Sequence, residues 1–249
     1  MSSNDEPKPA DKAWITMHKE MVKTTQLHQF AKDYVFWRTT DEGKTGMKEH
    51  EDKVKFIREK LSKEHIKSLT QEELLECYSK LYATSNINAH KPFFEKNVIK
   101  ANGGFDYVKK ELTELLHGED EIEVRYEKGI ANIKQFADST ISELINNIYP
   151  DRCCMWNDMV LKAIPILGLE KLIPKKILNG KTVRLAADYK KCNELMSYVM
   201  EEVSSYGITN FYLLDSLFWY TASRLYWRIQ PGEGGENWDE QQKNKIIGV

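Results

Sequence analysis

The chain has 249 residues, and its 36 basic and 38 acidic side chains give a formal net charge of −2 at pH 7. This balance excludes a protein that is drawn to nucleic acid or to anionic membranes by its overall charge, so any contact with DNA must use a local basic patch. The polar start, residues 1–12, lacks the apolar run of a secretion signal, and no later stretch is apolar enough to span a bilayer. We expect a cytoplasmic protein without membrane contact, whose residues 1–12 are disordered.

The residue types that bind metals or form disulfides show no informative spacing. The four cysteines lack metal-ligand spacing, and two of them are adjacent, which is awkward for a structural disulfide. The six histidines lack the i, i+4 pairing of a metal-binding helix. We therefore expect a reduced intracellular setting, no metal site and no cofactor. These residues are Cys77, Cys153, Cys154 and Cys192, and His18, His28, His50, His65, His90 and His117.

Apolar residues recur at helical spacing near the start of the chain. From Trp14 to Trp37 they predict one long amphipathic helix, which the polar segment Asp41–Gly46 breaks. The apolar residues among the charges of Val54–Leu61 then indicate a second, charged helix.

Capping signals place the next helices. Thr70 with Glu73 forms a capping-box pattern, which predicts a helix over Gln71–Ala83. After a polar loop, a further helix starts near Phe93 and is stopped by an Asn-Gly-Gly sequence. Phe105–His117 is predicted to be helical, with the glycine that follows it as its C-terminal cap.

The second half of the chain carries four further helical patterns. Between the first two lies a loop that contains the adjacent cysteines and Trp156, and a proline and a glycine end these two helices. The predicted helices are Asp138–Ile148, Asn157–Leu167, Ala186–Ser205 and Asn210–Trp227.

Together these patterns predict an all-α fold, a multi-helix orthogonal domain of roughly nine to eleven helices without internal repeats or β-alternation. We expect a single helical domain over residues 13–228, followed by a flexible tail over residues 229–249 that is rich in glycine and polar residues.

One stretch resembles a known family. Helix-hairpin-helix DNA glycosylases of the endonuclease III type carry a Gly-hydrophobic-Gly turn, a Lys-Thr-Ala helix start and a Val-Asp loop before a helix that ends in Leu-Gly. In this chain Gln135-Phe136-Ala137 and Thr140-Ile141 occupy the first two patterns without a gap. Asn157 falls at the family's catalytic aspartate, and Val160 and Leu167-Gly168 continue the match. The resemblance implies a glycosylase-like core over about residues 105–228.

The departures from the family concern its chemistry. The turn glycines let backbone N–H groups approach a DNA phosphate, whereas Gln135 and Ala137 replace both of them here. Ser139 stands where bifunctional members have a lysine nucleophile, and Asn157 cannot supply the negative charge of an aspartate. Asp158 is adjacent, but one residue along a helix start rotates a side chain by about 100°. We expect no catalytic residues and no base excision.

Candidate DNA-binding residues follow from this stretch and from a basic connection after it. Basic loops are usually solvated, but a local cluster of lysine and arginine can also bind phosphate. The hairpin and pocket candidates are Lys134, Gln135, Phe136, Ser139, Trp156, Asn157 and Asp158. The possible phosphate contacts are Lys171, Lys175, Lys176, Lys181 and Arg184.

Two residues have both a structural and a functional interpretation. Trp156, beside Asn157, could stack on an extruded base, but large aromatics are mostly packing residues, and we favour a buried loop anchor. Asp215 lies within the apolar run of the last helix, where a carboxylate is either a buried hydrogen-bond partner or a site residue. For Asp215 we also favour the structural role.

The function that we expect is a non-catalytic DNA-binding module that reads modified or distorted bases in a restriction or defence system. Three further segments look similar to helical modules associated with McrB-type modification-dependent restriction ATPases. They are SELINNIYP, MWNDMVLKAIPILGL and LLDSLFWY. No Gly-rich phosphate loop occurs in the chain, so an ATPase or nuclease would be a separate subunit. The alternatives are an active glycosylase or lyase that uses a displaced carboxylate such as Asp158 or Asp138, and a helical protein-interaction domain.

Overall fold

The structure is a computed structural model that describes residues 16–180 and 182–228. Every regular element of these residues is helical, which confirms the prediction of an all-α fold. None of the described helices is both long and apolar enough to cross a membrane. The segments expected to be disordered at the start and flexible at the end, residues 1–12 and 229–249, lie outside the described residues.

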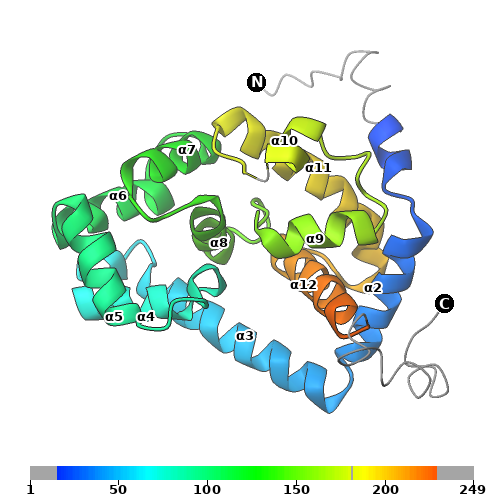
Figure 1. The fold of residues 1–249 in the computed structure, drawn as a ribbon, viewed down its shortest axis with the longest axis horizontal. Coiled ribbons are helices and arrows are strands. Elements are labelled where there is room, and N and C mark those ends of the chain that lie inside the picture. Colours follow the sequence, from blue (N-terminus) through cyan, green and yellow to red (C-terminus); the bar gives the residue numbers. More distant parts are fainter. Residues whose placement is uncertain (1–15, 181, 229–249) are drawn as a thin grey trace, which may run out of the picture.

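The helices form two groups on either side of α8 (Asp138–Ile148), as Figure 1 shows. The first group contains α3 (Asp41–Lys60), α4 (Gln71–Lys80), α5 (His90–Phe93), α6 (Phe105–His117) and α7 (Ile122–Asn132). The second contains α2 (Thr25–Trp37), α9 (Asp158–Ile166), α10 (Lys175–Gly180), α11 (Ala186–Val203) and α12 (Phe211–Arg228). The chain thus starts in the second group, crosses along α3 to the first, and returns after α8.

Short tight helices connect several of these elements. One of them, the 3-10 turn η2, follows α4 and lines a cleft together with α3. The connections are η1 (His65–Lys67), η2 (Tyr82–Thr84), the π-helical turn η3 (Phe94–Ile99), η4 (Lys100–Asn102) and η5 (Ser204–Tyr206).

The central position of α8 follows from its side chains. All residues from Thr140 to Asn147 are buried, although several are polar. The helix packs against α3, α6, α7 and η2 in the first group and against α12 in the second. A polar side chain on a helix buried on all sides is costly unless it has a hydrogen-bond partner. Glu143 accepts from η2, and Ser142 and Asn146 bond to the loop before α9. The Oδ1 atoms of Asn146 and Asn147 have no partner among the described residues.

The prediction of one long helix up to Trp37 was wrong. A helix over residues 16–21 ends first, and α2 begins anew after Thr24, whose hydroxyl accepts a hydrogen bond from Leu27 N at 3.1 Å. The same hydroxyl donates to Leu167 O at 2.6 Å, so this break also attaches α2 to the end of α9. Because the apolar periodicity continues across the break, the sequence pattern does not reveal where the first helix ends.

The prediction that Asp41–Gly46 breaks a helix was also wrong, because this segment is the start of α3. The chain turns just before it, where the Thr40 hydroxyl accepts a hydrogen bond from Gly43 N at 3.1 Å. A side chain at Gly43 would place its Cβ 2.0 Å from Trp37 O, so only glycine permits this close approach of α3 to the end of α2.

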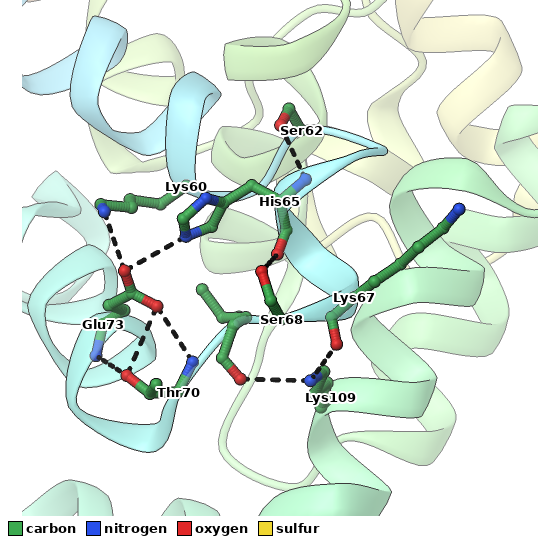
Figure 2. A network of polar contacts seen from close by, with 9 residues as sticks. Lys60, Ser62, His65, Lys67, Ser68, Thr70, Glu73 and Lys109 are labelled. Carbon is green, nitrogen blue, oxygen red and sulfur yellow. Dashed lines mark hydrogen bonds and ion pairs between the residues drawn. The ribbon is translucent and has the colours of Figure 1, made fainter.

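The later boundaries agree more closely with the sequence. The predicted capping box is present: the Thr70 hydroxyl accepts from Glu73 N at 3.2 Å, and Glu73 accepts from Thr70 N at 3.0 Å (Figure 2). Glu73 also accepts from Lys60 Nζ at 2.8 Å, and these hydrogen bonds lower its pKa to about 2. The helix α4 ends at Lys80, before the predicted Ala83, because the chain tightens into η2.

The helices α6, α8 and α9 match their predicted bounds to within a residue. Asn157 caps the start of α9, and Gly168 ends it in the left-handed region with a φ of 71°. The helix α10 lies inside the connection that the sequence left unassigned. Tyr126 of α7 stacks on Tyr189 of α11 with ring centroids 3.8 Å apart, so apolar packing is continuous between the two groups.

Candidate functional site

A cleft of about 620 Å³ separates α3 and η2 on one side from α8, α9 and α12 on the other. Its size is that of a small-molecule site, and such sites typically combine apolar walls with a few polar groups. Four of the seven hairpin and pocket candidates line it: Ser139, Trp156, Asn157 and Asp158. The cleft thus collects the pocket candidates that the sequence proposed.

Asn157 uses both ends of its amide within the protein. Its Oδ1 accepts from Met159 N at 2.9 Å and from Val160 N at 3.0 Å, which caps α9. Its Nδ2 donates to Asp215 Oδ1 at 3.2 Å and so connects α9 to α12. An aspartate could cap the helix equally well, but it would place a second carboxylate against Asp215. Asparagine at this position therefore complements the aspartate on α12.

Asp215 has a role that the sequence alone did not favour. It is the hydrogen-bond partner of Asn157, which agrees with a structural role, but it also lines the cleft and is only partly buried. Burial raises its pKa to about 7, while the hydrogen bond from Asn157 acts in the opposite direction. A carboxyl group that titrates near neutral pH in a cleft is typical of functional sites.

Glu143 is a further carboxyl group of the cleft, and no sequence pattern singles it out. It follows Ser139 by one turn of α8, is 4 % exposed, and accepts from Tyr82 N at 2.8 Å and from Ala83 N at 2.9 Å. Burial, with a smaller contribution from the charge of Asp215, raises its pKa to about 7, while the two backbone hydrogen bonds act in the opposite direction. The sequence marks Glu143 only as a charged residue within a helical segment whose neighbouring residues are uncharged.

The opposite wall of the cleft is aromatic. The His50 ring lies 4.6 Å from the Tyr212 ring and 5.1 Å from the Tyr82 ring, measured between centroids. Burial and the nearby Lys53 lower the pKa of His50 to about 4, so its imidazole is neutral at pH 7. Lys53 Nζ lies 4.6 Å from the centroid of the Tyr82 ring. This wall offers flat surfaces and one cation.

Two aromatic candidates are packing residues at their positions. Trp156 is 1 % exposed and Phe136 is 3 % exposed, and Phe136 stacks on Tyr78 with centroids 5.7 Å apart. Trp156 borders the cleft without offering an open face, in agreement with the favoured interpretation as a loop anchor. The exposed aromatic residues of the cleft are Tyr82 of η2 and Trp219 of α12, each 43 % exposed, and the sequence did not single out either of them.

The hairpin residues lie at the turn between α7 and α8. Lys134 and Gln135 are exposed, and Gln135 has a φ of 73°, the one positive φ among the described non-glycine residues. Asn102 fixes this turn, because its Oδ1 accepts from Lys134 N at 2.8 Å and its Nδ2 donates to Lys134 O at 3.2 Å. Gln135 thus adopts the conformation that favours glycine at the position where the resembled family has one.

The basic connection does not join the cleft. Lys171, Lys175 and Arg184 are exposed, and none of them lines it. Lys176 pairs with Asp188 at 2.7 Å. Lys181 lies outside the described residues.

Within residues 16–180 and 182–228, no group of three or more histidine, cysteine or acidic side chains is placed to hold a metal ion. The four cysteines are free and buried, and burial raises the pKa of Cys77, Cys153 and Cys192 to about 12. No protein-family model, curated protein or solved structure matches this chain.

The raised pKa of Asp215 predicts a specific pH dependence. The native state retains a proton on this group that the unfolded chain has already released, so the free energy of unfolding falls as pH rises from about 4 through about 7. We expect Asp215→Asn to reduce that fall by an amount on the order of 2 kcal/mol. Urea denaturation at pH 4.5 and at pH 8 measures it.

The control is Asp158→Asn, which neutralises an exposed carboxylate at the rim of the same cleft. This variant should keep the pH dependence of the unmodified protein. Identical pH dependence in the Asp215→Asn variant and the unmodified protein would contradict the assignment of Asp215 as a desolvated carboxyl group.

Proposed function

We propose that this chain is a non-catalytic DNA-binding module that receives an extruded base in the cleft between α3 and α8. The carrying observation is that the stretch resembling the glycosylase core has its hairpin turn exposed at one end and its Asn157 at the cleft. Proteins that act on or read single bases hold the DNA backbone while the base leaves the duplex and enters a pocket. Translocation or cleavage in a restriction or defence setting would come from a separate ATPase or nuclease subunit.

The exposed turn supports a contact with the DNA backbone. Lys134 and Gln135 project from a turn whose conformation is fixed by Asn102. An exposed lysine suits a phosphate oxygen, and such contacts position a protein without reading sequence. Side-chain contacts here would replace the closer backbone approach that glycine allows.

The walls of the cleft support a contact with a flat ring. Tyr82 and Trp219 are both more than 40 % exposed, at 43 % each, and both line the cleft. Bases stack on such faces irrespective of their sequence. The neutral imidazole of His50 adds a polar group without a charge.

The hydrogen bonds that Asn157 makes within the protein support binding without catalysis. Its Oδ1 is occupied by two backbone donors of α9, and its Nδ2 by Asp215. It therefore has no free group to activate water, and it carries no charge to stabilise an oxocarbenium ion.

A second function, base excision, is favoured by one observation. Asp215 supplies a carboxyl group 3.2 Å from the Asn157 amide, in the same cleft. Among the displaced carboxylates, Asp158 is exposed at the rim, and Asp138 accepts from Val183 N at 3.2 Å. Asp215 is therefore a better candidate general base than either of them.

Lys134→Glu tests the proposed binding function. Because log K falls with log salt in proportion to the number of phosphates contacted, the variant should weaken binding to duplex DNA and lower the slope by about 1. Fluorescence polarisation with labelled duplexes at several salt concentrations measures both quantities. Lys32→Glu, an equal change of charge on an exposed site of α2, should leave the slope unchanged. Absence of binding to any duplex at low salt would refute the proposal.

Incubation with damaged duplexes separates the two functions. Because Asn157 lacks the family's negative charge, we expect duplexes with uracil, oxidised guanine or alkylated bases to give no strand breaks after alkali. Breaks that vanish in Asp215→Asn but persist in Asp158→Asn would instead establish base excision.

A further inference from the structure

The charges of the cleft select among the bases that it can receive. Its lining contains five carboxyl groups but only two lysines, Lys53 and Lys162. The imidazole of His50 does not change this balance at pH 7, because its pKa is lowered to about 4. The carboxyl groups are Glu49, Asp138, Glu143, Asp158 and Asp215.

Most of the inner acceptors are already occupied. Both oxygens of Glu143 accept backbone N–H groups of η2, and Asp138 Oδ2 accepts from Val183 N. Asp215 differs, because one hydrogen bond reaches it from the described residues, and that bond ends on Oδ1. A carboxylate has about four acceptor sites on its two oxygens, so Asp215 retains acceptor capacity at the cleft.

A ligand at Asp215 must therefore bring N–H donors. Adenine, cytosine and guanine carry an exocyclic amino group next to a ring nitrogen, and a carboxylate that accepts from the amino group of cytosine is a standard pairing. Thymine and uracil instead have one ring N–H between two carbonyl oxygens, so a carboxylate that accepts from this N–H also brings an oxygen against a carbonyl. A carbonyl facing a desolvated carboxylate is unfavourable.

We infer that the cleft binds amino-bearing bases, with the exocyclic amino group donating to Asp215, and that it discriminates against thymine and uracil. This inference rests on the proposed function for the delivery of the base by DNA, but the chemistry of the pocket holds for a free nucleoside as well. A protonated Asp215 would donate to a carbonyl of thymine or uracil as readily as to the ring nitrogen of adenine or cytosine, so the preference belongs to the ionised carboxylate and is tested at pH 8.

Two arms of one experiment test the inference. In the first, duplexes that differ only in one unpaired base, adenine, cytosine or thymine, are compared by fluorescence polarisation. In the second, cytidine, adenosine and uridine are titrated into the ¹⁵N-labelled protein, and amide shifts are followed by NMR. We expect the amino-bearing ligand to bind about tenfold more tightly than its thymine or uracil counterpart in at least one arm.

The variant Asp215→Asn should reduce this preference to about twofold or less, because an amide presents a donor as well as an acceptor. Asp52→Asn should keep it, since that change removes the charge of an exposed carboxylate on α3 that does not line the cleft. Thermal unfolding establishes that both variants are folded.

The outcomes separate the inference from the proposed function. Nucleoside preference without DNA binding supports the inference and refutes the proposed function. DNA binding that is equal for all unpaired bases, together with no nucleoside preference, overturns the inference and leaves the proposed function standing. A preference that survives Asp215→Asn also overturns it, since another group would then read the base.

Discussion

The cleft depends on one buried carboxyl group that bridges two parts of the chain far apart in sequence. Glu143 in α8 accepts two backbone N–H groups of η2, and so fixes Tyr82 at the edge of the cleft. No described cation pairs with Glu143, and its pKa is raised to about 7 by burial. Hydrogen bonds from two amides compensate part of the cost of desolvating it. The wall formed by α3 and η2 is held to the central helix by this contact.

The pair formed by Asn157 and Asp215 performs the same task on the other side of α8. Asn157 caps α9 and donates to Asp215 of α12, so a single side chain connects two helices of the second group at the cleft. An aspartate at this position, as in the resembled family, would meet Asp215 across 3.2 Å, where two carboxyl groups cannot both ionise. Asparagine at position 157 and the carboxyl group of Asp215 are therefore physically linked.

The sequence predicts the helices wherever a local signal marks their ends, as the capping box at Thr70, the cap at Asn157 and the left-handed Gly168 do. It fails near Thr24, because a threonine cap inside a continuing apolar pattern is a weak signal, and near Thr40, because the polar first turns of α3 resemble a loop. Ser139, Asn157 and Asp158 were found through a resemblance between short segments. Glu143 was missed because its importance comes from the backbone of η2, some sixty residues earlier. A contact between residues so far apart in the chain leaves no local pattern in the sequence.

The central claim is that a base leaves the duplex and enters the cleft, and 2-aminopurine as a single unpaired base in a duplex tests it directly. Stacking quenches the emission of this base, so its entry into the cleft should change its emission and protect it from quenching by acrylamide. Ser139→Phe, which adds a ring at the cleft, should reduce that protection while binding through the hairpin turn persists. Saturating binding that leaves both the emission and the acrylamide quenching unchanged would contradict the account.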